Sequence, residues 1–331
     1  MAPSGAAAAG SRRLRSGAVA DLVTRARDGE PLAVARLISL VEEASPLLRE
    51  VMAALAPHTG RAQVVGITGS PGVGKSTATS ALVTVLRAAG RRVGVLAVDP
   101  SSPFSGGALL GDRVRMADHA LDPGVYIRSM ASRGHLGGLA WSTPQALRVL
   151  DAAGCDVVLV ETVGVGQSEI EIAGLADTTL VLLAPGMGDG IQAAKAGILE
   201  IGDVYVVNKA DREGADQVHR ELRSMLALAQ RPVGGWRPPV VKTVAAAGDG
   251  LGEVAAEIER HRHWLTETGE LATRRTRRAR GEVEAIALTA LRERWGDVRG
   301  RSELDALATS VAAGETDPYT AADELLAAVA H

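Results

Sequence analysis

Seven short apolar runs alternate with longer helical patterns from residue 63 onward, and this alternation limits the fold more than any other feature of the chain. Each run is continuously apolar rather than alternately apolar and polar, which is typical of strands buried on both faces of a parallel sheet. The runs are VVGIT, VGVLAVD, VYIRSM, DVVLVE, TTLVLLAP, VYVVNKAD and VVKTVAA. Strands interleaved with helices predict an α/β fold, with a mostly parallel sheet covered by helices on both faces.

Helical patterns flank this central region on both sides. Residues 18–60 place apolar residues at three- and four-residue intervals, which predicts two or three helices, and the chain after residue 250 is again helical. We therefore expect an N-terminal helical extension over 18–60, an α/β domain over 61–260 and a C-terminal helical region over 261–331. Residues 1–17 are rich in Ala and Gly and lack the amphipathic spacing of a transit peptide, so a disordered tail is favoured over a targeting segment.

The composition argues against several classes of protein. A net charge of -3 in 331 residues gives no overall positive field for nucleic acid or an anionic membrane, and no apolar run reaches the length of a membrane span. Cys155 is the single cysteine, which excludes a disulfide framework and suits a cytoplasmic protein. The histidines are scattered and predict no metal cluster. The run RRTRRAR at 274–280 has no interleaved aromatic residues, so it indicates a solvated or dimer-facing helix.

The segment GSPGVGKST lies between the first apolar run and a helical pattern, and it fits the phosphate-binding P-loop. Its glycines allow backbone N–H groups to turn toward phosphate oxygens at the amino end of the following helix. Lys75 is expected to reach the β- and γ-phosphates, and the Ser76 hydroxyl to ligate magnesium. The nucleotide contacts expected here come from Gly69, Ser70, Pro71, Gly72, Val73, Gly74, Lys75, Ser76 and Thr77.

Two acids at strand ends are candidates for further magnesium ligands and, with Lys75, for catalysis. Asp99 ends VGVLAVD and Glu161 ends DVVLVE, so both lie at the carboxyl edge of the predicted sheet, where open α/β sheets bind ligands. Gly164 follows Glu161 at a spacing that would turn its amide toward the γ-phosphate. Asp112, in a Gly-rich loop, is a third candidate ligand. The alternative is that Asp99 and Glu161 only cap the turns after their strands.

The group Asn208-Lys209-Ala210-Asp211 leaves a strand end, as the guanine-reading signature of GTPases does. Asp211 would accept hydrogen bonds from guanine N1–H and N2–H2, a pair of donors that adenine lacks. Asn208 would steady the neighbouring loop or the base edge, and the Lys209 stem would lie over the ring. Losing a charged hydrogen bond costs about 1.5–3 kcal/mol, so GTP is expected over ATP. The loop of Val244, Ala245 and Ala246 could offer a backbone amide to guanine O6.

Lysine usage supports this reading of the site. Of 36 basic residues only four are lysines, and all four lie within the predicted α/β domain: Lys75, Lys195, Lys209 and Lys242. Because the chain uses arginine elsewhere, a retained lysine indicates a place where a compact ammonium on a slim stem is needed.

Three long segments go beyond the general GTPase pattern: VDPSSPFSGGALLGDRVRM (98–116), SRGHLGGLAWST (132–143) and VLVETVGVGQSE (158–169). They closely resemble the MeaB/MMAA family, the G-protein chaperones of adenosylcobalamin-dependent acyl-CoA mutases, chiefly methylmalonyl-CoA mutase. The likeness covers roughly residues 20–330. It implies a P-loop GTPase core of the SIMIBI class, a homodimer built by the C-terminal helices, and a role in gating cofactor loading and protecting the mutase.

The resemblance also implies roles for individual residues. It assigns phosphate contacts to Lys75, magnesium to Ser76, Asp99, Asp112 and Glu161, and guanine to Asn208, Lys209 and Asp211. It implies nucleotide-responsive switches at 99–115 and 161–169. A third loop near 185–200, with Asp189, Lys195 and Glu200, is the one that the family uses to relay the nucleotide state to the mutase. The guanine loop VAAAG lacks the Ser-Ala pair often found there, so its contact stays open.

Two other functions remain open. A nickel-delivery GTPase shares this core but needs Cys and His ligands, and the chain has one cysteine. A small-molecule kinase needs an acceptor pocket and a closing lid, and the guanine motif argues against most kinases. No arginine finger stands out, and Gln167 lies at a different offset from the water-orienting Gln of small GTPases, so we expect slow intrinsic turnover that a partner raises.

Overall fold

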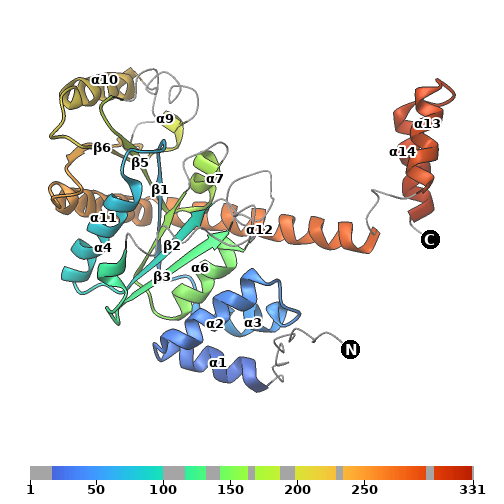
Figure 1. Cartoon of the computed structure of the whole chain (residues 1–331), viewed down its shortest axis with the longest axis horizontal. Helices are drawn as coiled ribbons and strands as arrows, with labels where there is room; N and C mark the ends of the chain where they lie inside the picture. Colours follow the sequence, from blue (N-terminus) through green and yellow to red (C-terminus); the bar gives the residue numbers. More distant parts are fainter. Residues whose placement is uncertain are drawn as a thin grey trace, which may run out of the picture. The chain divides into compact units, whose positions relative to one another are not determined.

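A seven-stranded sheet forms the centre of the larger of two compact units, Met1–Arg274 and Arg275–His331. The computed structural model of the chain describes residues 17–99, 116–131, 142–162, 168–186, 198–228, 234–295 and 302–329. All strand pairs are parallel and the order across the sheet is β3-β2-β4-β1-β5-β6-β7 (Figure 1). The strands are β1 (Gln63–Thr68), β2 (Val93–Asp99), β3 (Val125–Ala131), β4 (Val157–Glu161), β5 (Thr178–Leu183), β6 (Val204–Asn208) and β7 (Val240–Thr243). Each of the seven apolar runs is a strand, which confirms the predicted α/β class.

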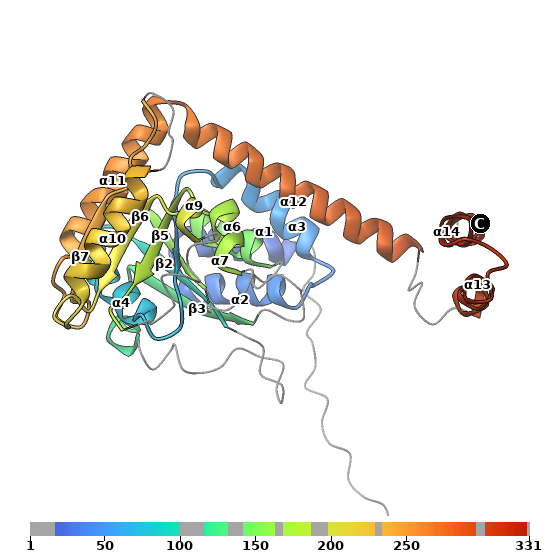
Figure 2. The same ribbon diagram turned by 90° about the horizontal axis from the view of Figure 1, so that it is seen from above.

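Helices cover both faces of the sheet (Figures 1 and 2). One face packs against α4 (Lys75–Ala88) and α11 (Leu251–Glu267), and the other against α6 (Thr143–Ala152), α7 (Ser168–Leu175) and α10 (Ala215–Leu228). Neighbouring residues of one strand therefore enter different cores: Val64 packs on the α6 side, while Val65 and Ile67 pack on the α4 side. This double burial is the physical reason why the strands are continuously apolar.

A glycine inside β1 lets a helix come close to the sheet. A Cβ atom on Gly66 would meet the side chains of Ile172 and Ala176, at the end of α7. The strand thus has no side chain at the position where α7 packs against it.

Three helices form the N-terminal extension and pack outside α6: α1 (Gly17–Arg27), α2 (Pro31–Glu42) and α3 (Leu48–Leu55), followed by the short η1 (Ala56–His58). The extension is joined to the edge of the sheet by polar contacts. Arg128 on β3 pairs with Glu42, and the hydroxyl of Tyr126 donates to the carbonyl of Gly29 at 3.1 Å. The predicted two or three helices are therefore three, and they share a core with the sheet.

The C-terminal helices begin within the larger unit. After α11, α12 (Glu270–Trp295) starts there and supplies most of its residues to the smaller unit, in which α13 (Ser302–Ala312) packs against α14 (Pro318–Val329). Two further short elements are η2 (Ala117–His119) and α9 (Ile198–Ile201). Within the described ranges, no helix combines the length and the apolar character needed to cross a membrane.

Candidate nucleotide site

The residues singled out for nucleotide binding gather at the carboxyl edge of the sheet. The glycine-rich loop follows β1, Glu161 ends β4, Asn208 ends β6, and the loop 244–246 follows β7. Because all strands are parallel, these four ends lie on the same edge. Parallel topology thus brings together side chains that are far apart in sequence.

Glycines of the phosphate loop adopt a backbone that other residues rarely take. Gly69, Gly72 and Gly74 have φ angles of 139°, 82° and 93°. A Cβ atom on Gly69 would overlap the carbonyl oxygen of Leu182, and one on Gly74 would lie 2.6 Å from the amide nitrogen of Asn208. At these two positions glycine is required both by the left-handed backbone and by the close approach of a neighbouring strand end.

Lys75 begins α4, and its side chain turns back over the loop. The side chain is only 7% exposed, and Nζ donates to the carbonyls of Gly69 at 2.6 Å and Ser70 at 3.2 Å. Its neighbours differ in exposure: Val73 is buried in the core under α4, whereas Pro71 and Thr77 are exposed. The loop is therefore anchored at Val73. The Lys75 ammonium and the glycine backbone lie at the amino end of α4, a 14-residue helix.

A buried carboxylate lies directly below this helix end. The Ser76 hydroxyl donates to Glu161 Oε1 at 2.6 Å, and the Thr79 hydroxyl is 3.0 Å from Glu161 Oε2. Glu161 is 6% exposed, and it lies opposite Ile67 of β1 and Ala97 of β2 in the sheet register. The structure therefore brings Ser76 and Glu161 together, and both offer hard oxygen atoms of the kind that Mg²⁺ prefers.

The other expected ligands are described only in part. Asp99 is the last residue of β2, two positions beyond Ala97, so its backbone lies at the same edge as Glu161; its side chain is outside what the structure describes. Asp112 and Gly164 lie outside the described residues, as do Asp189 and Lys195 of the third loop. Glu200 is described and is exposed on α9.

Asn208 joins the phosphate loop to the loop after β7. Its Nδ2 donates to the carbonyl of Val73 at 2.8 Å, and its Oδ1 accepts from the Thr243 hydroxyl at 3.1 Å and from the Ala245 amide at 3.0 Å. The side chain is 2% exposed. Of the two roles weighed for Asn208, these contacts are those of a residue that steadies the loops.

Lys209 and Asp211 follow Asn208 at the surface of the site. Lys209 has a φ of 58°, a left-handed backbone that is uncommon for a residue other than glycine, and its Nζ donates to the carbonyl of Gly72 at 2.6 Å. Asp211 is exposed, and among the described contacts its carboxylate has no hydrogen bond or ion pair. Backbone strain of this kind collects at functional sites because the surrounding structure must hold it in place.

Backbone hydrogen bonds in the loop after β7 leave one amide open. The N–H of Val244 donates to Asp249, that of Ala245 to Asn208, and that of Ala247 to Val244. Ala246 is exposed, and no described group accepts from its N–H. Of residues 244–247, Ala246 is therefore the one whose amide is available to a ligand.

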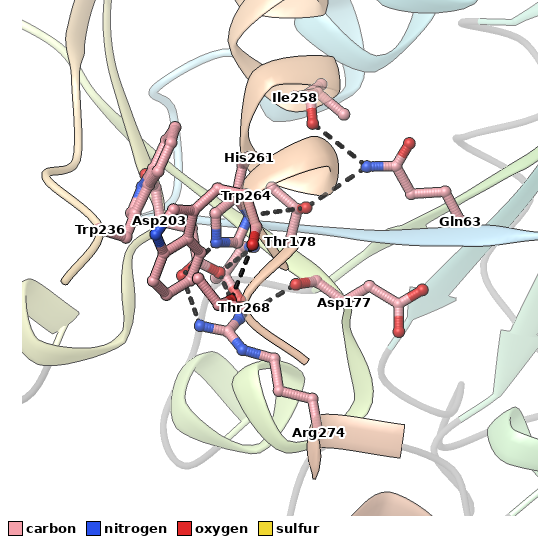
Figure 3. A network of polar contacts seen from close by, with 11 residues as sticks. Gln63, Asp177, Thr178, Asp203, Trp236, Ile258, His261, Trp264, Thr268 and Arg274 are labelled. Carbon is pink, nitrogen blue, oxygen red and sulfur yellow. Dashed lines mark hydrogen bonds and ion pairs between the residues drawn. The ribbon is translucent and has the colours of Figure 1, made fainter. Parts of the chain in front are cut away.

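A second polar cluster, which sequence reasoning missed, lies at the opposite, amino edge of the sheet (Figure 3). Arg274, in the first turns of α12, donates to Asp203 through both terminal nitrogens at 2.8 and 2.9 Å, and to the carbonyl of Asp177 at 3.0 Å. Asp203 also accepts from the backbone amide of Thr179 at 2.9 Å, just inside β5. This bidentate pair fixes the start of α12 to the starts of β5 and β6.

His261 of α11 is buried at the centre of this cluster. Its Nδ1 is 2.9 Å from the Thr178 hydroxyl, its Nε2 is 3.4 Å from Asp203 Oδ1, and the rings of Trp236 and Trp264 pack on it. Burial lowers the pKa of His261 to about 4, although Asp203 acts in the opposite direction. His263, two residues on, is exposed, as its place on the other side of the helix requires. Within the described ranges, no three His, Cys, Asp or Glu side chains gather to hold a metal ion.

Known proteins resemble the chain along most of its length. The model of the family described as Methylmalonyl Co-A mutase-associated GTPase MeaB matches residues 34–297. A protein of Pyrococcus abyssi named as a GTPase is 48% identical over 309 residues, which cover 92% of this chain and 95% of that protein. The mouse protein named Methylmalonic aciduria type A homolog, mitochondrial, is 35% identical over 318 residues, covering 91% of this chain and 77% of that protein. The crystal structure named LAO/AO transport system kinase superposes with a TM-score of 0.74 at 27% identity, covering 96% of this chain and 99% of that one.

Proposed function

Because this chain belongs to the MeaB family of methylmalonyl Co-A mutase-associated GTPases and is itself a P-loop GTPase, we propose that it is the G-protein chaperone of an adenosylcobalamin-dependent acyl-CoA mutase, most directly methylmalonyl-CoA mutase. In this role it gates the loading of the cofactor and protects the mutase. The observation that carries the proposal is the family match over residues 34–297, which includes the whole nucleotide site.

The phosphates of GTP lie against the loop 69–77 in this proposal. Its glycine amides and the amino end of α4 bind the phosphate oxygens, and Lys75 exchanges its two loop carbonyls for the β- and γ-phosphates. Water attacks the γ-phosphate in line with the leaving oxygen. The protein lowers the barrier by placing the Lys75 charge and the backbone amides where negative charge develops.

Magnesium fits the oxygen atoms that meet below the loop. Ser76 and Glu161, already in contact, would hold it, and Asp99 and Asp112 would complete the set of protein oxygens. Bound magnesium supplies positive charge to the phosphate oxygens. Glu161 contributes by holding the Ser76 and Thr79 hydroxyls in place from the side of the sheet.

Guanine lies over the loops that Asn208 connects. The free carboxylate of Asp211 accepts from N1–H and N2–H2, the Ala246 amide donates to O6, and the Lys209 stem covers the ring. Asn208 contributes indirectly, because it holds the phosphate loop and the guanine loop at a fixed separation.

Two copies of the chain form the working unit. The support for this is a set of exposed apolar side chains along α12: Val283, Ile286, Leu288 and Leu291. A helix that exposes four large apolar residues is typical of an interface.

The first test is GTP hydrolysis by the purified full-length protein with magnesium, alone and with methylmalonyl-CoA mutase from the same organism. We expect slow release of phosphate that the mutase raises by roughly 10³-fold or more, as partners of other GTPases do. Lys75→Ala is expected to lower the rate by about 10²–10³-fold in both conditions. Lys242→Ala is the matched control, because that lysine is exposed and pairs with Asp216 on the surface.

Other outcomes separate the alternatives. Phosphate release that is fast without a partner and unchanged by the mutase would leave the GTPase and reject the chaperone role with this mutase. Transfer of phosphate to a small acceptor instead of water would indicate a kinase.

A further inference from the structure

A small pocket of about 230 Å³ lies at the amino edge of the sheet, away from the nucleotide loops. Its wall contains residues that precede three strands: Arg61 before β1, Arg91 before β2 and Asp156 before β4. Arg27 at the end of α1 and Arg262 on α11 also line it. The six residues of β1 span about 20 Å between this edge and the phosphate loop, so the pocket is a separate site.

The two carboxylates in the pocket are committed to the backbone. Asp151 accepts hydrogen bonds from the amides of Gly60, of Arg61 at 3.2 Å and of Ala62 at 2.9 Å. Asp156 accepts from the amide of Arg92 at 2.7 Å. These bonds hold the segments that enter β1 and β2. The acids therefore shape the wall of the pocket, and they keep their negative charge because their donors are neutral amides.

The four guanidinium groups of the pocket differ in their partners. Arg91 pairs with Glu259 at 3.6 Å. Over the part of the chain that the structure describes, the guanidinium groups of Arg27, Arg61 and Arg262 have no hydrogen bond and no ion pair. Four arginines and two carboxylates thus line one small space, and the arginines leave its wall with an excess of positive charge. His58 lines the same pocket and is half-buried.

We propose that this pocket binds a phosphate group. Guanidinium groups present planar pairs of N–H donors that match phosphate oxygens, and several of them around one anion are typical of phosphate recognition. The volume is below the roughly 300–1,000 Å³ of pockets that hold larger ligands. The ligand is accordingly inorganic phosphate or a small phosphomonoester.

A bound phosphate would connect three parts of the chain. Arg27 belongs to the N-terminal extension, Arg61 to the entry of the sheet, and Arg262 to the helix that leads to α12. Any ligand that binds only the folded state raises the melting temperature as its concentration rises. Binding therefore stabilises the attachment of α1 and α11 to the sheet.

The test uses full-length protein saturated with a non-hydrolysable GTP analogue and magnesium, so that the β- and γ-phosphate positions of the phosphate loop are already filled. Isothermal titration calorimetry at constant ionic strength measures the binding of inorganic phosphate and, separately, of glycerol 3-phosphate. The variant Arg61→Gln/Arg262→Gln removes two of the free guanidinium groups, and Arg36→Gln is the control because Arg36 is exposed on α2, outside the pocket. Single Arg27→Gln and Arg61→Gln proteins, both altered at exposed positions, replace the double variant if it does not fold.

We expect wild type and Arg36→Gln to bind one of the two anions with equal affinity. The double variant should bind that anion about 100-fold more weakly, because each arginine lost lowers the affinity roughly tenfold. The melting temperature should rise with the anion in wild type and not in the double variant. Tighter binding of glycerol 3-phosphate identifies an organic ligand, and tighter binding of phosphate identifies the free ion. Absence of binding at millimolar anion, or equal binding by wild type and the double variant, overturns the proposal.

Discussion

Gly74 and Asn208 show how single residues set the geometry of the nucleotide site. Gly74 has no side chain, and the amide of Asn208 occupies the space where a Cβ atom would be. From there Asn208 reaches the carbonyl of Val73 on one side and the amide of Ala245 on the other. The phosphate loop and the guanine loop are thus held together through one buried amide group.

Replacing Gly74 with alanine should damage the site more than its backbone angle alone explains. The left-handed backbone costs an alanine about 1–2 kcal/mol wherever it occurs. At Gly74 the new methyl would also displace Asn208 and break its hydrogen bond to Val73. We expect at least tenfold weaker GDP binding and a larger loss of unfolding free energy than in Gly90→Ala, measured by calorimetry and urea denaturation.

Gly90→Ala is the appropriate control. Gly90 has a φ of 76° and open space around it, at the far end of α4 from the nucleotide. If both variants bind GDP like wild type and lose equal unfolding free energy, the close contact between Gly74 and Asn208 contributes neither to GDP binding nor to stability.

The residues of the site differ in how far the sequence predicts them. Lys75 and Ser76 follow from a local motif, because the spacing of glycines, lysine and serine already defines the loop. Glu161 and Asn208 follow from their position at strand ends. The contact between Asn208 and Val73 does not follow, since 135 positions separate them and only the folded sheet brings them together.

At the scale of elements, the junction of α11 and α12 is the most firmly tied part of the C-terminal region. His261, Asp203 and Arg274 connect these helices to the amino ends of β5 and β6 in a setting shielded by two tryptophans (Figure 3). In this network Gln63 donates to Thr178, and the Thr178 hydroxyl can donate in turn to a neutral His261. A proton on His261 would add a positive charge next to Arg274 inside a buried space.

Stability should therefore fall with acidification. The folded pKa of His261, about 4, is below the ordinary value of 6.5, so the unfolded chain binds a proton first as the pH drops. The free energy of unfolding therefore decreases as the pH falls below 6.5, and at pH 5 it is lower by about 2 kcal/mol. The variant His261→Gln lacks this pH-dependent part of the unfolding free energy, because glutamine does not take up a proton. The difference in unfolding free energy between wild type and His261→Gln should shrink by that amount between pH 7 and pH 5, as measured by urea denaturation.

His263→Gln serves as the comparison, because it alters an exposed imidazole on the same helix and leaves His261 in place. It should retain the pH dependence of wild type. An unchanged difference between wild type and His261→Gln at both pH values would show that His261 is protonated as easily when folded as when unfolded.

The elements were predictable to the extent that their patterns are local. Continuous apolar runs such as VVGIT and DVVLVE marked the strands, and helical spacing marked both flanks. The role of Arg274 was not predictable, because it is the first residue of RRTRRAR and nothing in that run distinguishes it from its neighbours. In the fold the ion pair of Arg274 with Asp203 anchors the start of the helix, although the pattern indicated a solvated or dimer-facing helix.

At the scale of the whole molecule, the exposed apolar side chains of α12 predict assembly. Val283 and Ile286 are three residues apart on the helix. Val283 is 67% exposed and Ile286 is 47% exposed. Changing both to glutamate should convert a dimer into a monomer of 34.2 kDa, because burying two carboxylates in an apolar interface is costly. Sedimentation equilibrium on the full-length protein measures this directly.

Leu121→Glu provides the control, since Leu121 is 95% exposed in a turn of the larger unit. It should leave the mass unchanged. A wild-type protein that sediments as a monomer at micromolar concentration would remove the homodimer from the proposal.

Cys155, the only cysteine of the chain, is almost fully buried, and burial raises the pKa of its thiol to about 12. At neutral pH almost no thiolate forms, and thiol reagents react with thiolates. The natural protein is therefore suited to site-specific labelling without prior removal of a native cysteine. A single cysteine introduced at an exposed position such as Leu121 or Leu326 would carry a fluorophore alone, and its emission could follow nucleotide exchange and partner binding in the otherwise unaltered molecule.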